Sequence, residues 1–182
     1  MKVLALGGSG GMGRYAVQYL HNIKQIEKIY VADVNSLSAK KFASHFGNRV
    51  EGLKLDIRDF ETLKSEMSKV DIVVNTTGPF FLFAEPILKA AIQTNTHYFD
   101  ICDDWEPTEK MLQMNEDAKK ANITAIIGLG ASPGLTNILA HIAISELDEV
   151  RKVYTGWDMS AAKPESESSQ SGVSAAMVHG IE

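Results

Sequence analysis

The chain has 182 residues, and its 45% apolar content is that of a folded globular protein rather than a disordered one. Its formal net charge of −5 gives a nucleic-acid partner no electrostatic support, so we expect none. The single cysteine, Cys102, excludes an internal disulfide and favours a reducing compartment, so we expect a soluble cytoplasmic protein.

The chain opens on an apolar run over residues 3–6 that is followed by five glycines within seven residues. The run predicts a buried strand, and the residues after the glycines predict a helix. The apolar positions of that helix recur at helical spacing and are expected to form its buried face: Met12, Tyr15, Ala16, Tyr19 and Leu20.

Short apolar runs and helical patterns then alternate along the chain. Five further strands are expected, over residues 28–33, 50–55, 72–74, 97–102 and 124–129. The helices that follow them are expected to bury these stripes: Ala39, Phe42, Ala43 and Phe46; Phe60, Leu63 and Met67; Ala84, Ile87, Leu88, Ala91 and Ile92; Met111, Met114 and Ala118; Leu135, Ile138, Leu139, Ile142 and Ala143. Gly47 is expected to stop the first of these helices, and Pro86 to lie in the first turn of the third.

This alternation predicts an α/β fold, a doubly wound parallel sheet of the Rossmann type. Residues 121–145 carry no Asp, Glu, Lys or Arg, but Pro133 and Gly134 interrupt them, so we expect strand, turn and helix rather than a membrane span. Residues 1–149 are interpreted as the dinucleotide-binding domain. Residues 150–182, with a strand over 150–160 and a helix from 173, are interpreted as the truncated start of a second, α+β domain.

The glycines fit the pattern G-x-G-x-x-G at Gly8, Gly10 and Gly13, between a strand and a helix. Gly8 is expected to permit the sharp turn, Gly10 the approach of a pyrophosphate, and Gly13 close packing of the helix on the sheet. The helix N-terminus would hold the anion. The expected cofactor contacts of this loop are Gly8, Ser9, Gly10, Gly11, Met12 and Gly13. The alternative is a glycine-rich turn without a ligand.

Asp33 lies twenty residues after the last of these glycines, where its carboxylate could accept both ribose hydroxyls of NAD. A 2′-phosphate there would meet a like charge, so we expect NAD, with NADP as the alternative cofactor. Val34 and Asn35 are expected beside the ribose. The structural alternative is that Asp33 only caps the next helix.

Two later loops complete the expected cofactor path. Asp56 and Ile57 follow the third strand and are expected at the adenine edge. The residues after the fourth strand are expected at the switch point of the sheet: Thr76, Thr77, Gly78, Pro79 and Phe80. Phe80 and Phe81 would wall the nicotinamide side, unless they belong to the core.

Four stretches of the chain together resemble the saccharopine dehydrogenase-like family: GGSGGMGRYAV, VVNTTGPF, HYFDICDDWE and GLGASPGLTNILA. The resemblance covers most of the first 147 residues. It implies the NAD(P)-binding Rossmann domain of a larger oxidoreductase with an inserted α+β substrate domain. Such enzymes transfer a hydride to or from an imine or secondary amine that derives from an amino acid or a polyamine.

The same resemblance places candidate catalytic residues after the fifth strand, at Asp100, Cys102 and Asp103. In the family, an acidic residue together with a glycine often follows the Tyr-x-Asp motif. This chain has Cys102-Asp103-Asp104 there and so departs from that pattern. Cys102 could instead be a small buried residue, and Asp103 a solvated or helix-capping one. The five histidines are scattered without metal-ligand spacing, so we expect no metal.

We therefore expect an NAD(P)-dependent oxidoreductase acting on a small amino-acid-derived substrate, without membrane contact and as a homodimer. The 182-residue chain itself is expected to bind the cofactor without catalysing the reaction. The alternative from another class is a non-catalytic nucleotide-binding sensor or regulatory module. A short-chain-type reductase is disfavoured, because the Tyr-x-x-x-Lys pair is not found where that class needs it.

Overall fold

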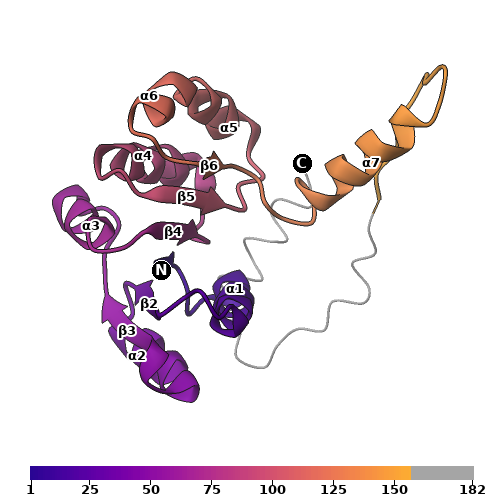
Figure 1. The fold of residues 1–182 in the computed structure, drawn as a ribbon. Helices are drawn as coiled ribbons and strands as arrows, with labels where there is room; N and C mark the ends of the chain where they lie inside the picture. Colours follow the sequence, from indigo (N-terminus) through magenta and orange to yellow (C-terminus); the bar gives the residue numbers. More distant parts are fainter. Residues whose placement is uncertain (157–182) are drawn as a thin grey trace.

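The computed structural model describes residues 1–156, and its centre is one six-stranded parallel sheet (Figure 1). The strands follow the order β3-β2-β1-β4-β5-β6. Their bounds are β1 Lys2–Leu6, β2 Lys28–Asp33, β3 Val50–Lys54, β4 Ile72–Asn75, β5 His97–Asp100 and β6 Ala125–Ile126. The prediction of a doubly wound parallel sheet is confirmed, and its switch point lies between β1 and β4.

Helices cover the two faces of this sheet. Their bounds are α1 Gly11–Asn22, α2 Ser36–Ala43, the 3₁₀ helix η1 Ser44–Arg49, α3 Phe60–Met67, α4 Phe80–Gln93, α5 Trp105–Leu112, α6 Asn115–Lys120 and α7 Leu135–Ser145. Along β1 the side chains alternate between two cores. Val3 and Ala5 pack with residues of α1 and α2, whereas Leu4 and Leu6 pack with residues of α3, α4 and α5.

Helix α1 buries a different face from the predicted one. Met12, Tyr15 and Tyr19 are exposed, and the buried positions are Gly13 and Val17. The backbone of the glycine-rich loop comes so close to Gly13 that no side chain fits there. This approach rotates the helix so that its smallest residue, rather than its most apolar stripe, faces the sheet.

Two predicted helices also differ in their limits. Helix α4 begins at Phe80, so Pro86 lies inside it and not in its first turn. The Phe81 N–H donates to the Asp104 carboxylate (2.9 Å), a long-range contact that holds this early start. The single helix expected to bury Met111, Met114 and Ala118 is two helices, α5 and α6, although Met111 and Ala118 are both buried as predicted.

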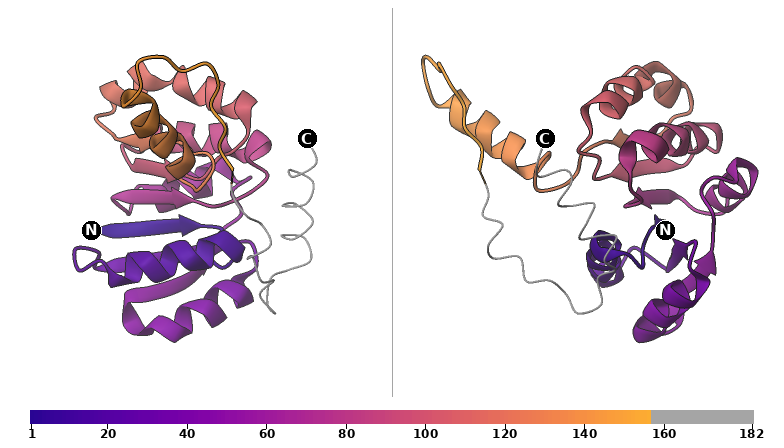
Figure 2. Two further views of the ribbon diagram at one scale, coloured as in Figure 1. Left: turned by 90° about the vertical axis from the view of Figure 1, so that its right-hand side faces the viewer. Right: turned by 180° about the vertical axis from the view of Figure 1, so that it is seen from behind.

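Helix α7 stands apart from the sheet, on the side of α1, in both Figure 1 and the right-hand view of Figure 2. Its predicted apolar stripe forms a helix, but none of its residues is buried, and Ile138, Leu139 and Ile142 are each more than half exposed. The expectation of a buried helix is therefore wrong. Among residues 1–156, no helix has the length and apolar character that crossing a membrane requires.

The chain after α7 carries none of the expected strand within residues 150–156, where Val153 and Tyr154 are exposed. The rest of that expected strand and the expected helix from residue 173 lie outside the described residues.

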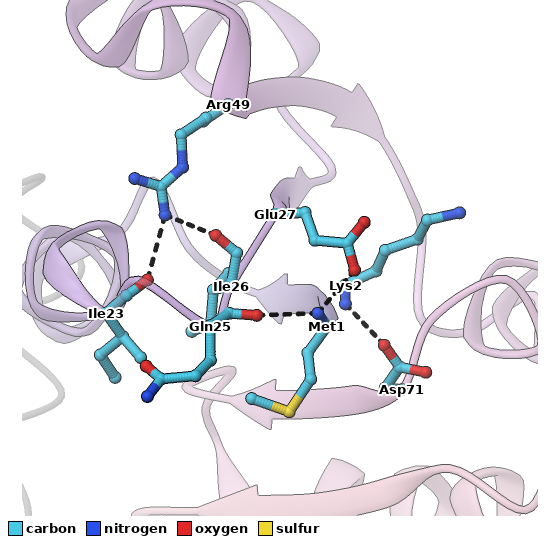
Figure 3. A network of polar contacts seen from close by, with 8 residues as sticks. All are labelled: Met1, Lys2, Ile23, Gln25, Ile26, Glu27, Arg49 and Asp71. Carbon is cyan, nitrogen blue, oxygen red and sulfur yellow. Dashed lines mark hydrogen bonds and ion pairs between the residues drawn. The ribbon is translucent and has the colours of Figure 1, made fainter.

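A polar network connects the chain at the amino-terminal ends of the strands (Figure 3). The Met1 ammonium donates to the Gln25 carbonyl (2.8 Å) and pairs with the Glu27 carboxylate (2.7 Å). The Lys2 N–H donates to Asp71 (2.6 Å), which joins β1 to the start of β4. Nη2 of Arg49 donates to the carbonyl oxygens of the turn between α1 and β2. The opposite, carboxyl edge of the sheet carries the candidate site.

Candidate functional site

The glycine-rich loop turns over residues 7–10, and Gly8 lies inside the turn as expected. Gly7, which begins the turn, has a φ of 66°, in the left-handed region, whereas Gly8 has no positive φ. Gly8 is required by space, because a Cβ there would lie 2.9 Å from the Ala5 carbonyl oxygen. The Gly10 N–H donates to the Gly7 carbonyl (2.9 Å) and closes the turn.

Gly13 brings α1 against this loop. A Cβ on Gly13 would lie 2.2 Å from the Gly7 carbonyl oxygen and 2.8 Å from Oγ1 of Thr76. The Thr76 hydroxyl in turn donates to the Leu6 carbonyl (2.8 Å). The loop, the first turn of α1 and the end of β4 are thus packed into one unit, with the helix N-terminus at its rim.

Asp33 connects the second strand to the glycine-rich loop. Its Oδ2 accepts the Ser9 hydroxyl (2.5 Å), and its Oδ1 accepts the Asn35 N–H (2.9 Å). The cap of α2 is Asn35, whose side chain accepts the Ser38 N–H (3.1 Å). The alternative in which Asp33 merely caps that helix is therefore not what the structure shows.

A pocket of about 390 Å³ opens beside Asp33 at the carboxyl ends of β1, β2 and β3, within the size range of small-molecule sites. Its lining residues are Leu6, Gly7, Ala32, Asp33, Val34, Leu55, Asp56, Ile57, Arg58, Thr77, Gly78 and Phe83. The strand register explains why two loops meet here. Asp33 pairs with Lys54, and the Leu55 N–H donates to the Asp33 carbonyl (3.0 Å).

Asp56 and Arg58 form an ion pair on the wall of this pocket. Nε and Nη2 of Arg58 donate to the two oxygens of Asp56 at 2.9 and 2.6 Å, and the Arg58 N–H donates to Oδ1 at 3.0 Å. These hydrogen bonds lower the pKa of Asp56 to about 2. Asp59 then caps α3 by accepting the Thr62 N–H (3.1 Å). The loop after β3 is therefore firmly structured.

The lining of this pocket includes the buried hydroxyl group of Thr77. Its Oγ1 is buried, yet the described residues offer it no hydrogen-bond partner. A buried hydroxyl without a partner costs about 1–3 kcal/mol, which a bound polar group would recover. Together with the pocket beside Asp33 and the carboxylate of that residue, this observation indicates that the residues present fit a dinucleotide.

The predicted catalytic residue Asp100 is buried, with 1% of its surface exposed. Its Oδ1 accepts the N–H groups of Cys102 (3.0 Å) and Gly128 (2.8 Å), and its Oδ2 accepts the Tyr98 hydroxyl (2.7 Å). Nδ2 of Asn75 donates to the same hydroxyl (3.1 Å). Burial raises the pKa of Asp100, against the opposing effect of these donors, and it raises that of Tyr98 well above its ordinary value. Asp100 thus joins β4, β5 and the chain after β6.

Cys102 is fully buried, and this burial raises the pKa of its thiol to about 11. At neutral pH the thiol is protonated, which fits the alternative of a small buried residue. Asp103 is exposed at the same end of β5, and Asp104 holds the start of α4. None of these three residues lines the described pocket.

The pocket unites part of the predicted cofactor path: Asp33, Val34, Asp56, Ile57, Thr77 and Gly78. The other predicted contacts lie outside its lining: Gly8, Ser9, Gly10, Gly11, Met12, Gly13, Asn35, Thr76, Pro79 and Phe80. Of the two expected nicotinamide walls, Phe80 packs against the core and Phe81 is 59% exposed. Sequence reasoning missed Arg58 and Phe83. Arg58 follows Asp56 by two residues, a spacing that could have indicated the ion pair.

Comparison with known proteins gives several relatives. The C. elegans "Lipid droplet localized protein" is 28% identical over 139 residues, which are 70% of this chain and 32% of the relative. The S. pombe "Saccharopine dehydrogenase [NADP(+), L-glutamate-forming]" is 26% identical over 152 residues, 84% of this chain and 32% of that enzyme. The chain therefore spans about a third of the length of these curated relatives.

Among solved structures, the apo saccharopine dehydrogenase (L-Glu forming) of Saccharomyces cerevisiae superposes with a TM-score of 0.69 at 24% identity. The match covers 80% of this chain and 31% of the yeast chain, and it supports the fold. Residues 3–126 match the family described as "Saccharopine dehydrogenase NADP binding domain". The resemblance seen in the sequence is confirmed: the chain belongs to the saccharopine dehydrogenase NADP-binding-domain family.

Proposed function

We propose that this chain is the nicotinamide-dinucleotide-binding domain of an oxidoreductase that acts on an imine or secondary amine derived from an amino acid or polyamine. The observation that carries the binding function is the pocket at the carboxyl edge, where Asp33 is tied to the glycine-rich loop through Ser9. The substrate class is suggested by the family and by the name of the S. pombe relative. When bound, the dinucleotide supplies or accepts the hydride.

We further propose that the cofactor is NAD, although the family description and the S. pombe enzyme's name specify NADP. The pocket lining carries the carboxylates of Asp33 and Asp56 and the guanidinium of Arg58, a net charge of −1. A 2′-phosphate would bring its negative charge into this lining, whereas ribose hydroxyls would donate to Asp33. Arg58 already has its charge matched by Asp56.

The described residues supply binding groups more clearly than an acid or base. Asp100 and Cys102 are buried, and only Asp103 of the three predicted catalytic residues is exposed. We therefore propose that this chain binds the cofactor without turnover, and that a longer protein supplies the substrate pocket. Proximity and orientation, worth about 7–11 kcal/mol of the barrier, would be missing without that pocket.

The test is titration of the chain with NADH and NADPH, before and after Asp33→Ala. We expect the wild type to bind NADH more tightly and the variant to lose that preference. Asp148→Ala, which removes an exposed carboxylate outside the pocket, should leave both affinities unchanged. Equal NADH and NADPH affinities in the wild type, or a ratio that Asp33→Ala does not change, would count against the proposal.

A further inference from the structure

The pocket beside Asp33 contains one cation whose role in the proposed function is still unassigned. Arg58 lines the pocket, and 71% of its side-chain surface is exposed. Side-chain freedom usually makes an exposed arginine a poor binding group, because ordering it costs entropy. Here the contacts with Asp56 have already restricted it.

Those contacts fix the plane of the guanidinium. Nε and Nη2 donate to the two carboxylate oxygens of Asp56, and the backbone N–H of Arg58 donates to one of them. Such a side-on pair lies in the plane of the guanidinium and leaves its two faces available for stacking. A planar, delocalised cation stacks favourably on aromatic rings.

The rest of the lining suits a flat, mostly apolar ring. Leu6, Ala32, Leu55 and Phe83 contribute apolar surface to the same pocket. Asp33, where the proposed function puts the adenosine ribose, lies next to the end of β3, because the Leu55 N–H donates to its carbonyl. Arg58 follows Leu55 by three residues. A ribose at Asp33 therefore directs its base toward this wall.

We propose that Arg58, oriented by Asp56, is the platform on which the adenine ring of the dinucleotide stacks. The inference rests on the proposed dinucleotide function. It assigns Arg58 to the base rather than to a 2′-phosphate, because the guanidinium charge is already paired and the lining has a net charge of −1. The side chain acts through its planar face, so lysine cannot replace it.

The experiment measures dissociation constants of the full chain for NADH, NADPH, AMP and nicotinamide mononucleotide, the last of which has no adenine. Stacking of a base is worth about 1–3 kcal/mol, so we expect Arg58→Ala to weaken the first three by similar factors, about 5-fold or more. Nicotinamide mononucleotide binding should not change. Arg58→Lys should lose as much as Arg58→Ala, within about twofold, because it keeps the charge and loses the plane.

Arg151→Ala is the matched control, since Arg151 also pairs with a carboxylate two residues before it, Glu149, but lies outside the pocket. It should leave all four constants unchanged. Because Arg58 is exposed, its variants should keep the wild-type melting temperature, which confirms that they are folded.

Two results would overturn the inference. Arg58→Lys with wild-type affinity would show that the charge alone matters, and a loss confined to NADPH would show that Arg58 reads a 2′-phosphate. Both differ from failure of the proposed function, in which the wild-type chain binds neither NADH nor AMP.

Discussion

Tyr98 shows how a single hydroxyl holds several strands together. It accepts a hydrogen bond from Asn75 at the end of β4 and donates one to Asp100 at the end of β5. Asp100 then accepts the N–H of Gly128, beyond β6. All three side chains are buried, so each lost partner would leave a polar group away from water.

Tyr98→Phe should therefore lower the free energy of unfolding by about 1–3 kcal/mol, because it leaves Nδ2 of Asn75 and Oδ2 of Asp100 without this partner. Chemical denaturation measures the change. Tyr19→Phe removes the same hydroxyl from a side chain that is 76% exposed, and it should stay within about 0.5 kcal/mol of the wild type. Equal losses of unfolding free energy in the two variants would show that the buried hydroxyl contributes no more to stability than an exposed one.

At the scale of an element, the first turn of α1 holds two glycines, of which only Gly13 packs closely against other residues. A Cβ at Gly13 would overlap the backbone of Gly7 and Gly8, whereas a Cβ at Gly11 would meet no atom within 4 Å. Both positions lie in the first turn of the same helix and lack a positive φ. Alanine substitutions at the two positions therefore separate the cost of steric overlap in the folded protein from the gain that comes from restricting the unfolded backbone.

We predict that Gly13→Ala costs about 1–3 kcal/mol or more, because the overlapping atoms are backbone and cannot move aside. Gly11→Ala should be neutral or stabilise by up to about 1 kcal/mol, through the lower entropy of the unfolded chain. Urea denaturation compares the two variants. A tolerated Gly13→Ala would mean that α1 can retreat from the loop at little cost.

The elements differ in how far the sequence determines them. The first four strands and α3 follow from local patterns, because short apolar runs such as 72–74 lack helical periodicity. The last two strands are shorter than predicted: β5 ends at Asp100 and not at residue 102, and β6 covers only Ala125–Ile126 of the predicted 124–129. The buried face of α1 differs from the predicted apolar stripe, because the close packing at Gly13 that the glycine pattern predicted decides which face turns inward, and periodicity does not encode it. The start of α4 depends on Asp104, more than twenty residues away.

In the candidate site, too, some residues could be predicted from local sequence patterns, whereas others depend on long-range packing. The glycine pattern and Asp33 could be found because their spacing follows from the strand–loop–helix geometry. Arg58 and Phe83 enter the pocket only once the loop after β3 and α4 are placed beside Asp33. Cys102 is buried by the packing of α4 and α5 on the sheet, and Asp100 is held by Tyr98 and by the chain after β6. A resemblance in motif does not reveal these contacts.

At the scale of the whole molecule, the site joins the two halves of the sheet. Asp33 and Arg58 belong to the half formed by β1, β2 and β3, whereas Thr77 and Gly78 follow β4. A ligand that contacts both groups binds only when the halves are assembled. Its binding should therefore stabilise the complete fold rather than one part.

NADH at a hundred times its dissociation constant should raise the free energy of unfolding by about 2.7 kcal/mol. Urea denaturation with and without the ligand measures this shift, and fluorescence and circular dichroism should give coincident transitions. A ligand-induced separation of the two transitions would contradict joint binding by both halves.

Helix α7 keeps its leucine and isoleucine side chains in water, and Met12, Tyr15 and Tyr19 of α1 are exposed as well. Apolar surface of this kind is what chaperones and proteases recognise when they sort newly made chains. The abundance of the protein in a cell should thus be lower while these side chains stay exposed, even if the pocket beside Asp33 is fully formed.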